Sequence, residues 1–540
     1  MLSLAFALAA AAVAADDEDA LSLGPPPTDF SEAELDDPSP SRGGALAALG
    51  SAAALEAVCA DAEAWASCNG LLMRSADDAS AFEHAPFALL PARFPAEQLA
   101  HAAELAPTFG LLVDKIVDDL PWLMATLREA ADSDPFTKRL MKLCERVQRE
   151  GESQKARLAV LRSDYMLHEP DGGAEPPRLL QVELNTIAAS FASLSNRVSA
   201  LHAYLAARWP AVRRQLWDDA GRPSRLKLEN VLPANPSVER IAEAIARAHG
   251  VYGSRDAAVL FVVQPSERNA LDQELLRQQL WAAHGLRVIS RTLGQLAVEA
   301  KLAGNERRLT LGGAEVSVVY FRAGYTPDDY PSAKEWSTRL LLERSHAIKC
   351  PSVAQHLAGC KKVQQQLAVP GELERFLPPA DCEKLRSVFA GQWSLAGPAE
   401  PADDAPAEEH AAALHMRRAI EAPDGYVMKP QREGGGHNFF GQELADALKS
   451  LSREQRAAFT LMQRIFPREQ ESVLVRRGRP TAGPALSELG LYSTFVRAPS
   501  GRVLLNSPAG HLVRTKLHGV NEGGVAAGFA VLSSPLAAKR

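Results

Sequence analysis

Several patterns that mark common enzyme and binding classes are absent from this 540-residue sequence. The six cysteines include no C-x-x-C pair, which argues against a zinc site and a disulfide framework and indicates reduced, structural thiols. No G-x-x-x-x-G-K-[ST], G-x-S-x-G or H-E-x-x-H motif occurs, so a Walker A site, a serine hydrolase and a zinc protease have no support. A basic excess is also missing, because the net charge is −7, and this argues against nucleic acid as a partner. Small-molecule chemistry is the function class that is left.

The N-terminal segment gives an ambiguous targeting signal. MLSLAFALAAAAVAADDED has an apolar run with small residues, as a signal peptide has, but it lacks a basic start and is too short to cross a bilayer with flanks. From residue 16 to about 50 the chain is rich in Asp, Pro, Ser and Ala, which predicts a disordered tail. We expect a cytoplasmic protein without stable membrane association, and plastid or secretory targeting stays open.

The stretch with the most chemical information is YVMKPQREGGGHNFFG, from Tyr426 to Gly441. It begins as a short apolar strand ending at Lys429 and continues as a glycine-rich loop that contains Glu433. Glycines have no Cβ, so backbone N–H groups of such a loop can turn toward phosphate oxygens. The lysine adds a positive charge, and the glutamate can hold a hard cation. A flexible surface loop would explain three glycines but not the charges around them, so the stretch predicts a site for a triphosphate with magnesium.

Two strand-like runs, LAVLRSDYMLH and PRLLQVELNTIAASF, are joined by the acidic turn HEPDGGAEPP and predict a hairpin. Glu183 and Asn185 lie two residues apart at the end of the second run. Strand side chains alternate, so both point to one face, where they could hold magnesium. A solvated strand end would explain these two residues equally well.

The overall pattern predicts an α/β fold with α+β elements. Residues 52–151 show helical spacing of apolar residues, whereas AAVLFVVQ, NALDQELLRQQLWAAHG, LRVIS and VSVVYFRAGY alternate between strand and helix. We therefore expect a tail at 1–51, core parts at 52–257 and 361–540, and an inserted substrate-binding domain at 258–360. Arginines near the strand ends, Arg268 and Arg322, favour a carboxylate ligand.

The rest of the chain is predicted to be mostly strand. HLAGCKKVQQQLA predicts one basic helix, and SLAGPAEPADDAPAEEHAAA predicts an exposed loop to which we assign no function. YVMK, FTLMQRI, ESVLVRRG and ALSELGLYSTFVR predict strands, and they are followed by a second glycine-bearing segment, GHLVRTKLHGVNEGGVAAG.

The chain contains, in this order, the segments VELNTIAASF, VVYFRAGY, LLLERSHAIKCP, LAGCKKVQQ, KPQREGGGHNFFG, SELG and RTK…GGVAAG. Together these seven segments resemble the motif series of the eukaryotic-type glutathione synthetases. The resemblance covers nearly everything after about residue 52. It implies an ATP-grasp fold with glycine-rich lid loops and a homodimeric ligase. Such a ligase joins γ-glutamylcysteine to glycine with ATP and Mg²⁺.

The resemblance also implies roles for individual residues. It gives the magnesium ligands as Glu183, Asn185 and Glu433, and the catalytic cations as Arg162, Lys361, Lys429 and Arg514. The implied ATP contacts are Lys361, Lys429, Gln431, Arg432, Glu433, Gly434, Gly435, Gly436, His437, Asn438, Phe440, Met462, Gln463, Arg464, Ile465, Glu488, Lys516 and Glu522. The implied peptide contacts are Arg162, Ala188, Ala189, Ser190, Glu267, Arg268, Asn269, Gln273, Arg322, Ala323, Gly324, Tyr325, Arg514, Val525 and Ala526.

Four positions depart from the animal enzymes. Ala188 stands in place of serine and Ala323 in place of aspartate, which affects hydrogen bonds to the peptide substrate. Phe440 and His437 stand in place of tyrosine and asparagine and affect only the lid. Other functions stay open at this point: a related ligase with another acceptor such as β-alanine, a phosphotransferase of similar architecture, and a catalytically impaired nucleotide-binding homologue.

Overall fold

The computed structural model describes residues 51–78, 80–169, 176–223, 227–431, 438–520 and 523–539. All of them belong to one unit, residues 44–540. Residues 1–50 of the predicted N-terminal tail, and the glycine triplet with its flanking Arg432, Glu433 and His437, lie outside the described residues. Within the described part of the chain, none of the helices has the length and apolar composition that crossing a membrane requires.

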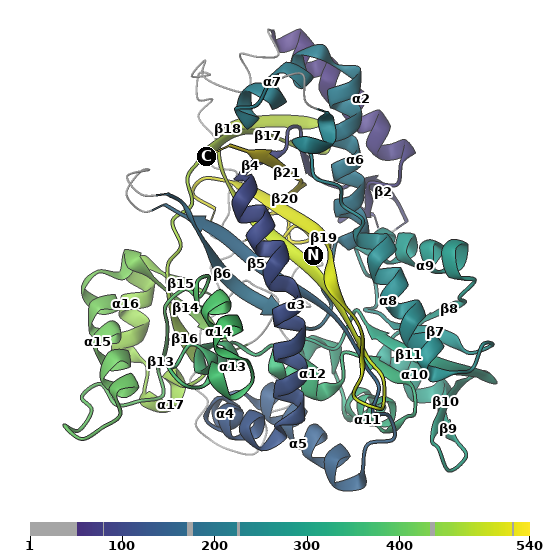
Figure 1. The fold of residues 1–540 in the computed structure, drawn as a ribbon, viewed down its shortest axis with the longest axis vertical. Helices are drawn as coiled ribbons and strands as arrows, with labels where there is room; N and C mark the ends of the chain where they lie inside the picture. The colour runs from purple at the N-terminus through teal and green to yellow at the C-terminus, as the bar shows by residue number, and fades with distance from the viewer. Residues whose placement is uncertain are drawn as a thin grey trace. The chain divides into compact units, whose positions relative to one another are not determined.

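A seven-stranded sheet forms the centre of this unit (Figure 1). Its strands follow the order β17-β3-β20-β19-β18-β5-β6, and the long strand β18 also pairs with β17. All neighbours are antiparallel except β20 and β3, so the sheet joins early and late parts of the chain. The strands are β3 (Phe87–Ala88), β5 (Arg157–His168), β6 (Arg178–Asn185), β17 (Gln470–Arg476), β18 (Arg479–Arg497), β19 (Val503–Leu517) and β20 (Val531–Ser533).

Helices cover both faces of this sheet, and strand β5 shows why. Ala159 and Leu161 pack into one core with helix α3, whereas Leu158 and Val160 pack into a second core with α6 and α8. Successive side chains of a strand point to opposite faces, so an apolar run such as this one buries both faces. Figure 1 shows α3 lying across the long strands. The helices are α3 (Ala96–Asp118), α6 (Ala192–Arg208) and α8 (Ser237–Tyr252).

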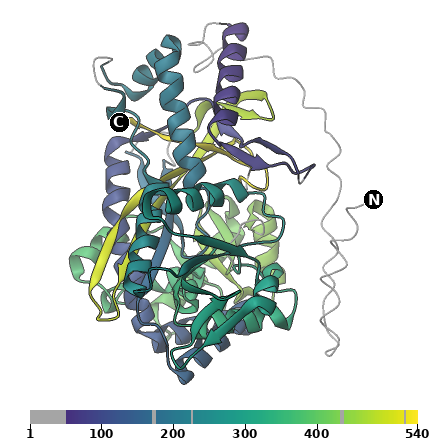
Figure 2. The same ribbon diagram turned by 90° about the vertical axis from the view of Figure 1, so that its right-hand side faces the viewer.

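A second sheet, shown in teal in Figure 2, carries the strand–helix alternation that the sequence predicts. Strands β8, β7, β11 and β12 are parallel neighbours, and β10 and β9 extend the sheet in antiparallel fashion. The elements are β7 (Ala258–Val262), α9 (Ala270–His284), β8 (Val288–Arg291), α10 (Leu293–Glu299), β9 (Ala300–Ala303), β10 (Arg308–Leu311), β11 (Ala314–Phe321), α11 (Ala333–Arg344) and β12 (Ile348–Cys350).

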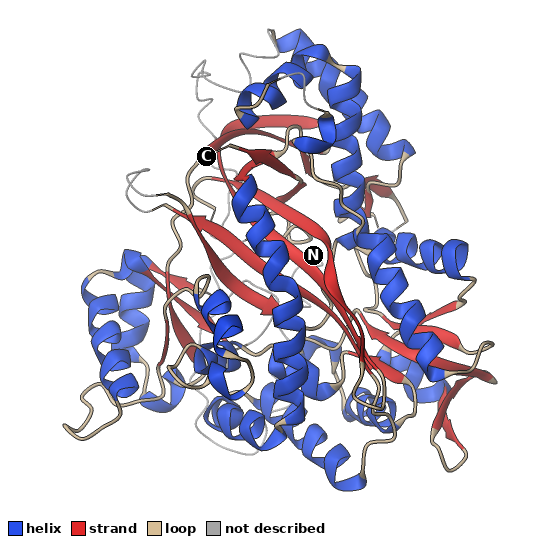
Figure 3. Cartoon of the chain, in the orientation of Figure 1, coloured by secondary structure: helices blue, strands red, loops and turns tan. Residues whose placement is uncertain are grey.

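A third, antiparallel sheet has the order β13-β16-β14-β15 and a small core of its own with α15 and α16, visible beside it in Figure 3. Its elements are β13 (Gln392–Ser394), α15 (Ala407–Glu421), β14 (Tyr426–Pro430), β15 (Phe439–Phe440), α16 (Gly441–Ser450), α17 (Arg453–Arg456) and β16 (Phe459–Gln463).

The other described elements frame these sheets. Strand β1 pairs with β2, and β21 pairs in parallel with β4. These framing elements are α2 (Ala52–Cys68), β1 (Leu72–Arg74), β2 (Phe82–His84), β4 (Ala92–Pro95), α4 (Leu120–Ser133), α5 (Pro135–Glu150), α7 (Pro210–Ala220), α12 (Val353–Ala358), α13 (Lys361–Leu367), α14 (Pro379–Arg386), β21 (Pro535–Ala538) and 3₁₀ turns at 228–230, 327–329, 373–375 and 423–425.

Several predicted elements are confirmed, and three predictions are wrong. The hairpin forms as β5 and β6, and the strands near 258, 288, 314, 426, 459, 470 and 485 are present. The segment at 52–151 is not purely helical, because the short strands β1 to β4 lie between 72 and 95. The basic helix is two helices, α12 and α13, because Gly359 ends the first. The predicted loop at 394–413 becomes helix α15 from Ala407 on, since alanine and glutamate favour helix.

Candidate active site

Asp164 is the carboxylate around which polar side chains of the central sheet gather. It lies on β5, and its side chain is 0% exposed. Arg162, two residues earlier on the same face of the strand, donates from Nε to Oδ1 at 2.7 Å and from Nη2 to Oδ2 at 2.8 Å. Arg514 of β19 and the amide of Asn185 at the end of β6 each donate to Oδ2 at 3.0 Å. One buried carboxylate thus orients three side chains from three strands.

Glu183 on β6 is surrounded by positive charge. Its Oε2 lies 3.3 Å from Nζ of Lys361, the first residue of α13. Burial alone raises the pKa of this carboxyl, but surrounding cations outweigh burial and lower the pKa to about 2. In order of effect these cations are Lys361, Lys429, Arg514 and Arg162. Glu183 is therefore ionised at neutral pH, and the site keeps a net positive environment suited to phosphate.

The end of β6 fits part of a magnesium site. Asn185 turns its amide nitrogen toward Asp164 and the Arg162 carbonyl, so its oxygen is directed away from them. Together with the Glu183 carboxylate it offers the oxygen ligands that Mg²⁺ prefers. No cluster of three or more His, Cys, Asp or Glu side chains suited to a metal occurs among the described residues. Glu433, the third ligand that the resemblance implies, lies outside them.

Glu488 on β18 is a second carboxyl with the opposite electrostatic character. It forms an ion pair with Arg514. Burial raises the pKa of Glu488, and the nearby charges of Asp164 and Glu183 raise it further, whereas Arg514 opposes them. The site therefore holds one carboxyl with a lowered pKa, Glu183, and one with a raised pKa, Glu488.

The third sheet carries one group of the predicted ATP residues. Lys429 of β14 is paired with Thr460 of β16, the strand that leads to Met462, Gln463, Arg464 and Ile465. Gln431 donates to Oγ1 of Thr460 at 3.1 Å and accepts from the Lys362 backbone at 2.7 Å, which ties the start of α13 to this sheet. Asn438 and Phe440 follow the undescribed loop, and Lys516 lies on β19 opposite Leu486.

The peptide side of the site begins at the connection between β6 and α6. Ala188 and Phe191 have φ values of 48° and 71°, which are unusual for residues with a Cβ. The Ser190 hydroxyl donates to the Ala188 carbonyl and accepts from Arg322 at 2.9 Å. The Ser190 carbonyl accepts from Arg162 at 3.4 Å and from the Tyr492 hydroxyl at 2.5 Å. Ser190 thus links Arg162 and Arg322, two of the four predicted peptide-binding arginines.

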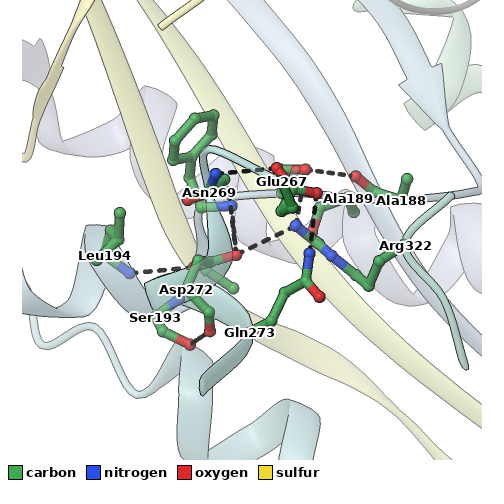
Figure 4. A network of polar contacts seen from close by, with 12 residues as sticks. Ala188, Ala189, Ser193, Leu194, Glu267, Asn269, Asp272, Gln273 and Arg322 are labelled. Carbon is green, nitrogen blue, oxygen red and sulfur yellow. Dashed lines mark hydrogen bonds and ion pairs between the residues drawn. The ribbon is translucent and has the colours of Figure 1, made fainter. Parts of the chain in front are cut away.

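Asp272 holds this connection in place (Figure 4). Its buried carboxylate accepts from the backbone N–H groups of Phe191, Ser193 and Leu194 at 2.8 to 3.2 Å. The same carboxylate lies 3.3 Å from Nη2 of Arg322. Burial lowers the pKa of Arg322, but Tyr320, Asp272 and other acidic groups raise it overall, so the guanidinium stays charged.

Two further loops complete the peptide side. Glu267 accepts from the Asn269 backbone at 2.9 Å and from the Gln273 side chain at 3.0 Å, beside Arg322 in Figure 4. Arg268 donates to the carbonyl of Ala526, next to the buried Val525. A Cβ added at Gly523, in the same segment, would lie 3.4 Å from Oε2 of Glu488. The second glycine-bearing segment therefore reaches from the peptide side to the carboxylate centre.

The structure thus brings most of the sequence-predicted residues into one region of the described chain. Glu522 and the loop residues Arg432 to His437 (Arg432, Glu433, Gly434, Gly435, Gly436, His437) lie outside the described residues. Sequence reasoning missed Asp164 and Asp272, the two buried carboxylates that orient the arginines. The R-S-D alternation at 162–164 was a usable signal for the first, because it places both charges on one strand face.

Residues 52–537 match the family model described as "Eukaryotic glutathione synthase, ATP binding domain". The chain belongs to the eukaryotic glutathione synthase family. The glutathione synthetase of Solanum lycopersicum, named as chloroplastic, is 42% identical over 485 residues, which cover 88% of this chain and 83% of the relative. The human enzyme is 40% identical over 473 residues, which cover 86% and 93%.

A solved structure has the same fold as this chain. The glutathione synthetase-like effector (GSS30) from Globodera pallida, in its apo form, superposes with a TM-score of 0.68 at 23% identity and covers 89% of this chain and 96% of that one. The predicted α/β fold of the glutathione synthases, the predicted family and the predicted ligase class with its use of ATP are confirmed.

Proposed function

We propose that this protein is a glutathione synthetase that joins γ-glutamylcysteine to glycine, with ATP and Mg²⁺, and gives glutathione, ADP and phosphate. The observation that carries the proposal is the setting of Glu183, an ionised carboxylate among four cations at the end of β6. A site of this kind can bind a metal–triphosphate and a carboxylate substrate together.

The chemistry requires two transfers. A carboxylate is a poor acylating agent, so its oxygen first attacks the γ-phosphorus of ATP, and ADP leaves. The amine of glycine then attacks the acyl carbon of the acylphosphate, loses a proton, and phosphate leaves. Glu183, Asn185 and Glu433 would hold Mg²⁺, and the bound ion would neutralise negative charge on the phosphate oxygens.

The residues of this chain have distinct parts in that scheme. Lys361 and Lys429 neutralise the transferring phosphoryl group, and Arg162 and Arg514, fixed by Asp164, hold the substrate carboxylate. Arg322, Ser190, Glu267, Asn269 and Gln273 bind the γ-glutamyl end. The loop at 432–437 and the segment at 523–528 exclude water, which would hydrolyse the acylphosphate.

The direct test is an assay of purified protein with γ-glutamylcysteine, glycine and Mg-ATP, followed by mass detection of the tripeptide. We expect tripeptide and ADP in equal amounts. Release of phosphorylated dipeptide would indicate a phosphotransferase, and ATP binding without turnover would indicate an impaired homologue. Glu183→Gln should lose turnover by orders of magnitude, whereas Glu443→Gln, on the exposed face of α16, should not.

Three wider features stay predictions. They are the division into 52–257, 258–360 and 361–540, a homodimeric assembly, and a cytoplasmic location. Sedimentation velocity tests the dimer, limited proteolysis tests the boundaries, and imaging of the tagged full chain tests the compartment.

A further inference from the structure

The loop after β11, residues 322–326, contains four of the proposed peptide-binding residues, and its own side chains do little to hold its backbone. Ala323 carries no polar side-chain atom and is buried in the core. Gly324 has φ of 97°, and a Cβ there would lie 2.9 Å from the Tyr330 hydroxyl. The backbone of this loop must therefore be held in position by residues outside 322–326.

Asp329 supplies those contacts. Its Oδ2 accepts from the backbone N–H groups of Gly324 at 2.8 Å, Tyr325 at 3.1 Å and Thr326 at 3.3 Å. Its Oδ1 accepts from Nε2 of Gln264 at 2.9 Å, and the same Nε2 lies 3.3 Å from the Tyr325 hydroxyl. This carboxylate thus holds three backbone N–H groups of the loop and, through Gln264, is linked to the Tyr325 hydroxyl. The Tyr330 hydroxyl adds one bond, which it donates to the Gly324 carbonyl at 3.1 Å.

We propose that Asp329 is a positioning residue for the dipeptide substrate, which sets the loop at 324–326 in its binding geometry without touching the substrate. This inference rests on the proposed function. It follows from the geometry because three backbone donors converge on one oxygen, and each charge-assisted bond is stronger than a neutral one. Arg322, at the start of the loop, is held by Asp272 and by Ser190. Asp329 therefore positions only residues 324–326, the second half of the loop.

The test compares Asp329→Asn with Asp328→Asn, the neighbouring aspartate, which is exposed. Both variants remove one negative charge from the same turn. For Asp329→Asn we expect KM for γ-glutamylcysteine to rise at least about tenfold, with kcat and KM for ATP within about twofold of wild type. Asp328→Asn should match wild type in all three.

A general structural role would lower kcat and the melting temperature together, and it would not change the ratio of KM for γ-glutamylcysteine to KM for ATP. A rise in KM for the dipeptide without a fall in kcat therefore distinguishes a positioning role from a structural one. If Asp329→Asn does not fold, Gln264→Met provides the second variant and should raise KM for the dipeptide about threefold. An unchanged KM in the folded variant overturns the inference. Wild-type protein that makes no tripeptide would instead overturn the proposed function, so the two failures are distinguishable.

Discussion

Gly490 faces Asp164 across the pairing of β18 with β5, and a Cβ at position 490 would lie 2.8 Å from Oδ1 of Asp164 and 2.9 Å from Cδ of Arg162. Real Cβ atoms do not approach so closely, so a side chain at position 490 would force the buried ion pair to shift. The arrangement of Asp164 and Arg162 therefore depends on the glycine at position 490 of β18 as well as on their own charges.

Gly490→Ala should therefore displace the ion pair. We expect a loss of about 2 kcal/mol in the free energy of unfolding and a clear fall in turnover, because the added methyl overpacks a buried site. Gly250→Ala is the matched control. No atom would lie within 4 Å of its Cβ, and alanine favours the helix α8, so stability should rise by about 0.5 to 1 kcal/mol. Urea unfolding checks both, and equal stability in both variants would contradict the argument.

Asp164→Asn should separate charge from shape at the same site. It leaves Arg162 and Arg514 buried beside a neutral amide, which we expect to cost about 3 kcal/mol of stability and about 100-fold in turnover. Asp118→Asn removes a partly exposed carboxylate that pairs with Arg157 and Arg497 and should cost less than about 1 kcal/mol. Denaturation and steady-state kinetics measure both, and a small loss at Asp164 would show that the arginines are held by other groups.

Buried histidines should make the protein sensitive to mild acid. Burial lowers the pKa of His202 to about 4, of His356 to about 3 and of His511 to about 4. The unfolded state, with pKa near 6.5, binds more protons below that pH, so stability falls as pH drops from about 6.5 toward 4. Each group adds a slope of up to about 1.4 kcal/mol per pH unit.

The measurement is the free energy of unfolding at pH 7, 6 and 5. His202→Gln keeps polar atoms near the Ser534 hydroxyl and the Ala88 carbonyl and should flatten the slope. A stability that does not change between pH 7 and 5 would refute the assignment.

Acceptor choice is a further prediction from the second glycine-bearing segment. Residues 523–528 read Gly-Gly-Val-Ala-Ala-Gly, and we expect glycine to exceed β-alanine by at least about tenfold in kcat/KM. A pocket discriminates one methylene by only about 1 to 3 kcal/mol, so some β-alanine product should form. Competition at equal concentrations, followed by mass detection of the products, measures the ratio. Equal yields would show that this segment does not set the choice.

Local patterns in the sequence were enough to predict much of the fold. The β5–β6 hairpin and the strand–helix alternation around 258–321 depend on spacing within one segment. The R-S-D alternation places Arg162 and Asp164 on one strand face, but the contact of Asp164 with Arg514 could not be predicted this way, because the two residues lie 350 positions apart in the sequence. Helix α15 was missed because a Pro-rich, acidic composition hid the helix-favouring residues that follow Pro406.

The pairing of β20 with β3, and of β21 with β4, has a consequence for how the protein is made. Phe87 meets Leu532, about 440 residues later in the chain, so the ribosome makes one partner long before the other. At typical synthesis rates, roughly 20 to 90 s pass between the synthesis of the early strands and the synthesis of their partner strands. During that interval the apolar side chains of β3 and β4 lack their final partners, so these two pairings can form only after residues 531–538 have been made.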